Sequence, residues 1–178
     1  MKRKTSLLFF LLIFYSTRLL AQNDNCSTAI ALTVGNGTCV NTAGTTVGAT
    51  QSQVGCAGSS DDDVWYSFVA AYYIETITVT PIGAGALSNA VFEVFSGSCG
   101  SLTTMGCVDA TTGSSAETSS LACYTAGATY YIHVYSFANG TGQGGGLTFA
   151  SLLLLQVVQI LPLLTMPPHP GSPRDVFS

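Results

Sequence analysis

Three consecutive aspartates, Asp61, Asp62 and Asp63, are the densest group of ionisable side chains in the sequence. Because side chains alternate along an extended chain, Asp61 and Asp63 could share one side and offer oxygens to Ca²⁺, together with residues 23–25. Asp62 would then point the other way. The alternative is a loop whose carboxylates accept hydrogen bonds from turn N–H groups before Val64. Calcium at Asp61 and Asp63 is the one cofactor that the sequence suggests.

A second group of candidates lies in the segment TYYIHVYSF, residues 129–137. Its more apolar alternate positions are predicted to face the core; these are Tyr130, Ile132 and Val134. The opposite positions, predicted to be wetter, are Tyr131, His133 and Tyr135. This second set could bind a sugar ring or a partner protein, with a purely structural role as the alternative. The single tryptophan, Trp65, is expected in the core.

The sequence gives little support for catalysis. No G-x-S-x-G motif is present, and His133 is the one histidine before residue 150, in mid-strand without an evident acid partner. No motif gathers the carboxylates into the pair that glycoside hydrolysis needs. We therefore expect the chain not to be an enzyme.

Six cysteines lie beyond residue 21, namely Cys26, Cys39, Cys56, Cys99, Cys107 and Cys123. In an exported chain they indicate disulfides, and the absence of a C-x-x-C pair disfavours zinc. Closeness in sequence favours Cys99 with Cys107 and Cys39 with Cys56. Other pairings of the six remain open at this stage.

Residues 1–21 have the features of a secretory signal peptide. A basic start at residues 2–4 precedes an apolar run that is too short to span a bilayer, and Ala21 is a suitable small residue before the cleavage site. Without this leader, one Arg remains against nine Asp and Glu, a formal charge of −8. Nucleic acid and anionic membranes are therefore excluded as partners, and no membrane span is expected in the mature domain.

Residues 22–149 read as one all-β domain, because short runs of β-branched and aromatic residues alternate with Gly, Ser, Asn and Thr clusters. The best strand candidates are residues 29–34, 64–70, 74–80, 90–96 and 129–137. Weaker candidates are residues 45–50, 102–107 and 117–124. This spacing predicts an antiparallel β-sandwich of jelly-roll or immunoglobulin-like type, supported by disulfides.

Three segments carry a family resemblance: NDNCSTAIALTVG (residues 23–35), DDDVWYSFVA (61–70) and VFEVFSGSCGSLTTMGC (91–107). In this order, followed by AGATYYIHVYSF, they resemble the β-sandwich repeats of secreted and cell-surface cargo of type IX secretion. Those repeats look related to the pre-peptidase C-terminal domain and often stand beside fibronectin type III modules.

The resemblance implies a non-catalytic adhesion or interaction module of a larger secreted or cell-surface bacterial protein. Its partner would be an extracellular protein or polysaccharide. A carbohydrate- or calcium-binding accessory module of a secreted hydrolase is the alternative. The resemblance also implies that Cys26 pairs with a cysteine of the last strand, which is missing in this sequence. Cys123 then has no expected partner. Either Cys26 or Cys123 would be free, or these two cysteines would form a disulfide with each other.

The apolar end of the chain departs from the resemblance. The stretch at residues 147–166 contains Gln156, Gln159 and Pro162 and lacks a basic flank, which disfavours a membrane anchor. A one-base change of reading frame near residues 144–146 would convert it into a polar linker. One permitted reading begins Phe-Asn-Ile-Cys-Ile at position 147, so residues 150–178 are predicted to be a frameshifted linker, which the coding nucleotide sequence would test. The written frame would leave a damaged last strand, with either a sheet edge or a hydrophobic groove exposed.

Overall fold

Nine strands and one helical turn make up the described part of the chain. The structure is a computed structural model that describes residues 21–35, 39–82, 89–138 and 146–152. The elements in chain order are η1 Cys26–Thr28, β1 Ile30–Ala31, β2 Asn41–Gly44, β3 Val64–Val69, β4 Ile74–Ile82, β5 Ala90–Ser98, β6 Ser101–Val108, β7 Glu117–Ala122, β8 Thr129–Ser136 and β9 Gly146–Leu152. Within these ranges no helix has the length and hydropathy needed to cross a membrane. The predicted all-β class is confirmed.

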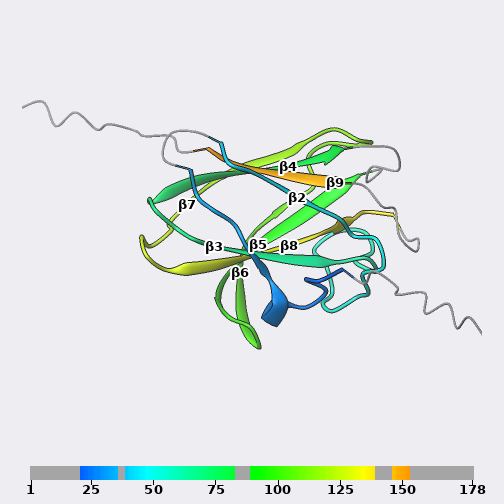
Figure 1. Cartoon of the computed structure of the whole chain (residues 1–178), viewed down its shortest axis with the longest axis horizontal. Coiled ribbons are helices and arrows are strands. Elements are labelled where there is room, and N and C mark those ends of the chain that lie inside the picture. Colours follow the sequence, from blue (N-terminus) through cyan, green and yellow to red (C-terminus); the bar gives the residue numbers. More distant parts are fainter. Residues whose placement is uncertain (1–20, 36–38, 83–88, 139–145, 153–178) are drawn as a thin grey trace, which may run out of the picture.

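The strands form two sheets in two layers (Figure 1). Sheet A has the order β1-β3-β8-β5-β6, and sheet B has the order β2-β9-β4-β7. The prediction of purely antiparallel sheets is wrong for sheet A, because β1 pairs with β3 in parallel. The chain leaves β1, passes through β2 in sheet B and only then returns as β3, and such a crossover is what a parallel pair requires.

One face of sheet A packs on the hydrophobic core between the layers. Alternate residues of β3 (Val64, Tyr66 and Phe68) belong to this core. Ile77 and Val79 join it from β4 of sheet B. The residues of β8 that the alternation placed inside are buried there as predicted, namely Tyr130, Ile132 and Val134. The period of two residues therefore assigned this face of β8 correctly.

The structure changes two of the predicted strands near the start of the domain. Residues 29–34 contribute only the two-residue strand β1. Residues 45–50 form no strand, because Ala49 N–H donates to the carbonyl of Thr46 and Gly48 adopts a φ of 76°. That left-handed conformation closes a turn, which glycine allows at little cost. The strand nearest to this turn is β2, which ends at Gly44, before the turn begins.

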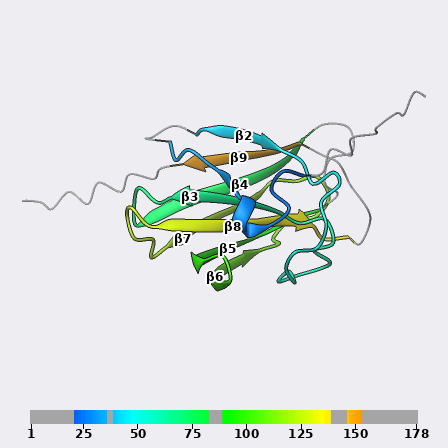
Figure 2. The ribbon, with the colours of Figure 1, turned by 60° about the horizontal axis from the view of Figure 1, so that its bottom comes forward.

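The last strand lies inside sheet B. β9 pairs with β2 on one side and β4 on the other (Figure 2). β9 runs to Leu152, past residue 149, where the domain is predicted to end. The last strand is expected to leave a sheet edge exposed. This expectation is wrong as regards backbone hydrogen bonding, because β9 is paired on both of its sides.

The change of reading frame concerns codons and stays a prediction. Residues 1–20 of the predicted leader and residues 153–178 of the predicted linker lie outside the described residues.

Candidate functional site

A row of chemically distinctive residues crosses the outer face of sheet A. In the strand register, Trp65 of β3 lies opposite His133 of β8, His133 lies opposite Glu93 of β5, and Glu93 lies opposite Cys107 of β6. Side chains at directly paired positions are close neighbours on one face of a sheet. The rings of Trp65 and His133 stack with centroids 4.6 Å apart. This row is the floor of the candidate site.

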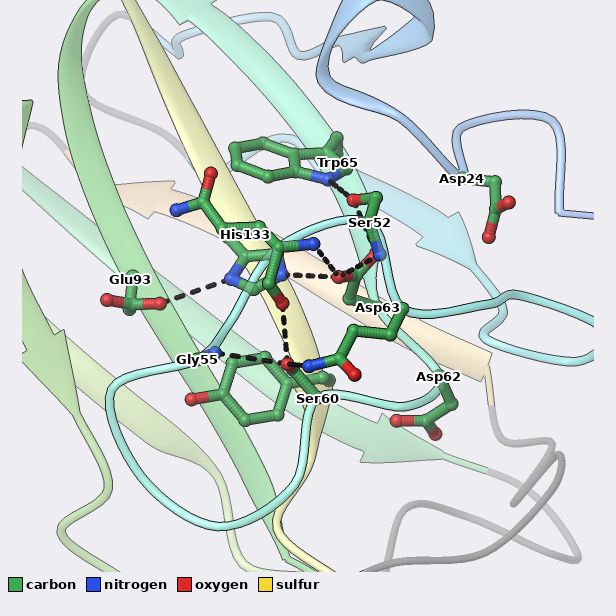
Figure 3. Close-up of polar contacts among 12 residues, drawn as sticks. Asp24, Ser52, Gly55, Ser60, Asp62, Asp63, Trp65, Glu93 and His133 are labelled. Atoms are coloured by element: carbon green, nitrogen blue, oxygen red, sulfur yellow. Dashed lines mark hydrogen bonds and ion pairs between the residues drawn. The ribbon is translucent and has the colours of Figure 1, made fainter. Parts of the chain in front are cut away.

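The imidazole of His133 lies between two carboxylates (Figure 3). Its Nε2 is 2.9 Å from Oδ2 of Asp63, and its Nδ1 is 3.1 Å from Oε2 of Glu93. His133 and Asp63 are fully buried, and Glu93 is nearly so. We call Asp63, Glu93 and His133 the acid–imidazole cluster. With both ring nitrogens facing carboxylates, the imidazolium is the protonation state that can donate to both.

Asp63 also holds a loop against the sheet. Its Oδ2 accepts hydrogen bonds from the backbone N–H groups of Ser52, at 2.9 Å, and Gln53, at 3.0 Å. Its Oδ1 accepts from the hydroxyl of Ser52 at 2.8 Å, and that hydroxyl in turn accepts from Trp65 Nε1 at 2.7 Å. Asp63 therefore joins His133 of the sheet to residues of the loop above it.

This loop, residues 51–60, is here named the covering loop. Cys56 in its middle is bonded to Cys107 of β6. The N–H of Ala57 donates to the hydroxyl of Tyr135 at 3.1 Å. A Cβ at Gly55 would lie 2.3 Å from the same hydroxyl, so only glycine lets the loop approach so closely. The covering loop thus packs directly on the outer face of sheet A.

Ser60 ties the two ends of the covering loop together. Its hydroxyl donates to the carbonyl of Gln53 at 2.6 Å and accepts from the N–H of Gly55 and the amide of Gln51, each at 3.0 Å. Ser60 is itself buried. Although the loop contains no helix or strand, its backbone is held at several points by side chains of fixed position.

The covering loop explains why the predicted ligand face is not wet. Tyr131, His133 and Tyr135 do share the outer face, but His133 and Tyr135 have no exposed surface and only Tyr131 is partly exposed. The expectation that this face is open to ligand is therefore wrong for His133 and Tyr135. The alternation of side chains reveals which residues share a face, whereas a loop that is distant in sequence decides whether that face meets solvent.

The predicted calcium ligands do not gather. Asp63 belongs to the acid–imidazole cluster, while Asp62 points away from it and accepts from Ser136 N–H at 3.0 Å (Figure 3). Asp61 is half-buried. Asp24 accepts hydrogen bonds from Thr50. Among the described residues, no three His, Cys, Asp or Glu side chains are grouped so that they could hold a metal ion.

Both predicted disulfides are wrong. Cys99 is bonded to Cys26 and not to Cys107, and Cys56 is bonded to Cys107 and not to Cys39. The bonds join elements 73 and 51 residues apart in sequence, which closeness along the chain could not indicate. Because Cys26 is bonded to Cys99, the implied last-strand partner of Cys26 and the alternative Cys26–Cys123 bond are also wrong. Cys39 and Cys123 are free and exposed, so of the alternatives left open a free Cys123 is confirmed. Two disulfides indicate an oxidising compartment.

Two further buried carboxylates, those of Glu75 and Glu117, hold turns in place. Glu75 accepts from the N–H groups of Ala71 and Tyr72, at 2.8 and 3.0 Å. Glu117 accepts from the N–H groups of Ala110 and Thr111, at 2.9 and 2.8 Å. Each carboxylate thus replaces the water that its loop N–H groups would otherwise bind. Glu75 and Glu117 each act singly on a loop, unlike Asp63 and Glu93, which share His133.

Glu93 and Ser52 are site residues that the sequence did not predict. Glu93 stands between Phe92 and Val94 in an otherwise apolar strand, and a lone carboxylate in such a position signals a buried partner. Ser52 has no comparable signal, because serine is common in loops.

The environment of His133 favours its charged form. Burial lowers the pKa of His133, but hydrogen bonding to Asp63 and Glu93 and their negative charges outweigh this effect and raise the pKa above its usual value. Tyr135, Trp65 and Phe95 are the other side chains against the ring, and the pKa of Tyr135 is raised by burial.

Stability is expected to fall as pH rises. The pKa of His133 is higher in the folded protein than in the unfolded chain, where it is about 6.5. His133 therefore stabilises the fold fully at pH values below about 6.5, and this stabilisation is lost as the pH rises through the folded-state pKa. Urea unfolding at a series of pH values above 6 should show this decline. His169→Gln should retain it and His133→Gln should remove it; an unchanged slope in His133→Gln would contradict the assignment.

The acid–imidazole cluster is closed to solvent. Both imidazole nitrogens are occupied, and neither His133 nor Asp63 has exposed surface. What the arrangement can do is to hold a proton and fix the covering loop.

No protein-family model matches this chain, and no curated protein matches it.

Proposed function

We propose that this chain is a non-catalytic adhesion or interaction module of a secreted or cell-surface protein, built as a β-sandwich of jelly-roll or immunoglobulin-like type. The observation that supports this most directly is the covering loop. It is fixed by Cys56–Cys107 and by Asp63, yet it presents Val54 with 80 % of its surface exposed. Its partner would be an extracellular protein or polysaccharide.

A rigid loop with an exposed apolar side chain suits binding for a physical reason. Ordering a flexible loop on association costs free energy, so a loop that is already fixed binds more tightly through the same contacts. Binding residues are commonly carried by loops that a rigid scaffold positions. Val54 would be the apolar contact, and its polar neighbours Gln53 and Gln51 would border it.

Replacement of Val54 tests the proposal. Beads coated with the purified domain would be exposed under flow to surfaces bearing extracellular polysaccharides and matrix proteins. Val54→Ser is expected to reduce retention about tenfold on a surface that holds the wild type, which corresponds to about 1.4 kcal/mol. The melting temperature should stay the same, because the side chain is exposed.

Val47→Ser is the matched control, since Val47 is also exposed, at 45 %, but lies outside the covering loop. It should be retained like the wild type. Equal retention of both variants, or no retention of the wild type on any surface, would refute the proposed role of the loop.

A further inference from the structure

A pocket of about 320 Å³ lies beside the covering loop, on the outer side of sheet A. Its walls come from four separate parts of the chain: Asn25 and Ser27 around η1, Gln53 of the covering loop, Trp65 of β3, and Gly100 with Leu102 where the β5–β6 turn leads into β6. The volume is near the lower end of the range of small-molecule pockets, about 300–1,000 Å³. It suits a single ring or a short oligomer.

The walls of this pocket are fixed before any ligand arrives. The Cys26–Cys99 disulfide joins η1 to the β5–β6 turn. Asp63 fixes Gln53 through its N–H, and the hydroxyl of Ser60 donates to the Gln53 carbonyl. The Gln53 side chain takes no part in these two bonds. A pocket whose walls are held covalently and by a buried carboxylate avoids the cost of ordering them on binding.

The lining of the pocket is neutral. None of the residues that line it is ionisable, since both its cysteines form the disulfide. Phosphorylated, carboxylated or cationic ligands would therefore lose their hydration without gaining a counter-charge. The amides of Asn25 and Gln53 and the hydroxyl of Ser27 can each donate and accept hydrogen bonds.

The pocket also offers apolar surface. Leu102 and the disulfide border it beside the amide and hydroxyl groups, and Trp65 lies in its wall with 1 % of its surface exposed. A sugar ring presents the same combination, with hydroxyl groups around its rim and C–H groups on its faces. Gln53 is next in sequence to Val54, so a glycan chain leaving the pocket could pass over the exposed apolar residue of the loop.

We infer that this pocket binds one residue of a neutral extracellular glycan. The inference rests on the proposed function, because it assigns the partner of the same loop to the polysaccharide class. It does not require Val54 to contribute to the binding of a single sugar.

Saturation-transfer NMR and isothermal titration of the disulfide-intact domain would test the inference. The probes are glucose, galactose, mannose, N-acetylglucosamine and their neutral disaccharides, with glucuronic acid and glucose 6-phosphate as charged comparators. At least one neutral sugar should bind with a Kd on the order of 1 mM, and neither charged sugar should bind more tightly. Gln53→Leu should weaken this binding at least about tenfold, whereas Gln22→Leu, outside the pocket, should not.

Two results would overturn the inference: no binding of any neutral probe, or equal binding by Gln53→Leu and the wild type at unchanged melting temperature. The Val54→Ser variant separates the two proposals. If it loses surface retention while no neutral sugar binds the wild type, the loop keeps its proposed role and the pocket does not. If a neutral sugar binds but surface retention does not depend on Val54, the pocket keeps its inferred role and the proposed role of the covering loop is refuted.

Discussion

Asp63→Ala is expected to destabilise the domain by about 3–5 kcal/mol, the usual cost of removing one partner from a buried charged group. The substitution would leave His133 with Glu93 alone and deprive the N–H groups of Ser52 and Gln53 of their acceptor. A single-domain protein is stable by only about 5–15 kcal/mol, so much of that margin would be lost. Chemical denaturation, followed by circular dichroism, measures the change.

Asp63→Asn separates charge from shape at the same position. It keeps an acceptor for the loop N–H groups but removes one of the two negative charges that face His133, so it should reduce the decline of stability with rising pH while Glu93 keeps part of it. Asp109→Ala is the surface control, because Asp109 is exposed and accepts only from Asn89 among the described residues. A loss for Asp63→Ala no larger than that for Asp109→Ala would show that the acid–imidazole cluster does not stabilise the fold.

Removal of the Cys56–Cys107 disulfide should have an effect of similar size. The bond joins residues 51 apart, and the loss of such a crosslink costs about 2–5 kcal/mol, mainly by freeing the unfolded chain. The double variant Cys56→Ser, Cys107→Ser should also loosen the covering loop. Trp65 is the single tryptophan and is 1 % exposed, so acrylamide quenching of its fluorescence would report the loosening directly.

The free cysteines supply the control for this experiment. Cys39→Ser with Cys123→Ser should change neither stability nor quenching, since both residues are exposed and form no disulfide, and the serine hydroxyl can keep the contact of Cys123 with the Tyr73 hydroxyl. Peptide mapping of the oxidised wild type should show Cys26–Cys99 and Cys56–Cys107. A Cys99–Cys107 peptide in the native protein would contradict this arrangement.

Local sequence determined most of the strands and one side of the core. An alternation such as that of Tyr130, Ile132 and Val134 depends on neighbours two residues apart, so it can be read from the chain. The same alternation correctly placed Tyr131, His133 and Tyr135 together on the opposite face. The clustering of Gly, Ser, Asn and Thr between apolar runs likewise marked most turns.

Only the tertiary structure decided which residues meet across long separations. Cys56 with Cys107, Asp63 with His133, and the covering loop with Tyr135 are pairs that no local pattern links. The burial of His133 follows from that loop, and its raised pKa follows from carboxylates contributed by two other segments. Strand pairing and loop packing are set by the free energy of the whole fold, and for that reason the sequence alone identified the face but not what covers it.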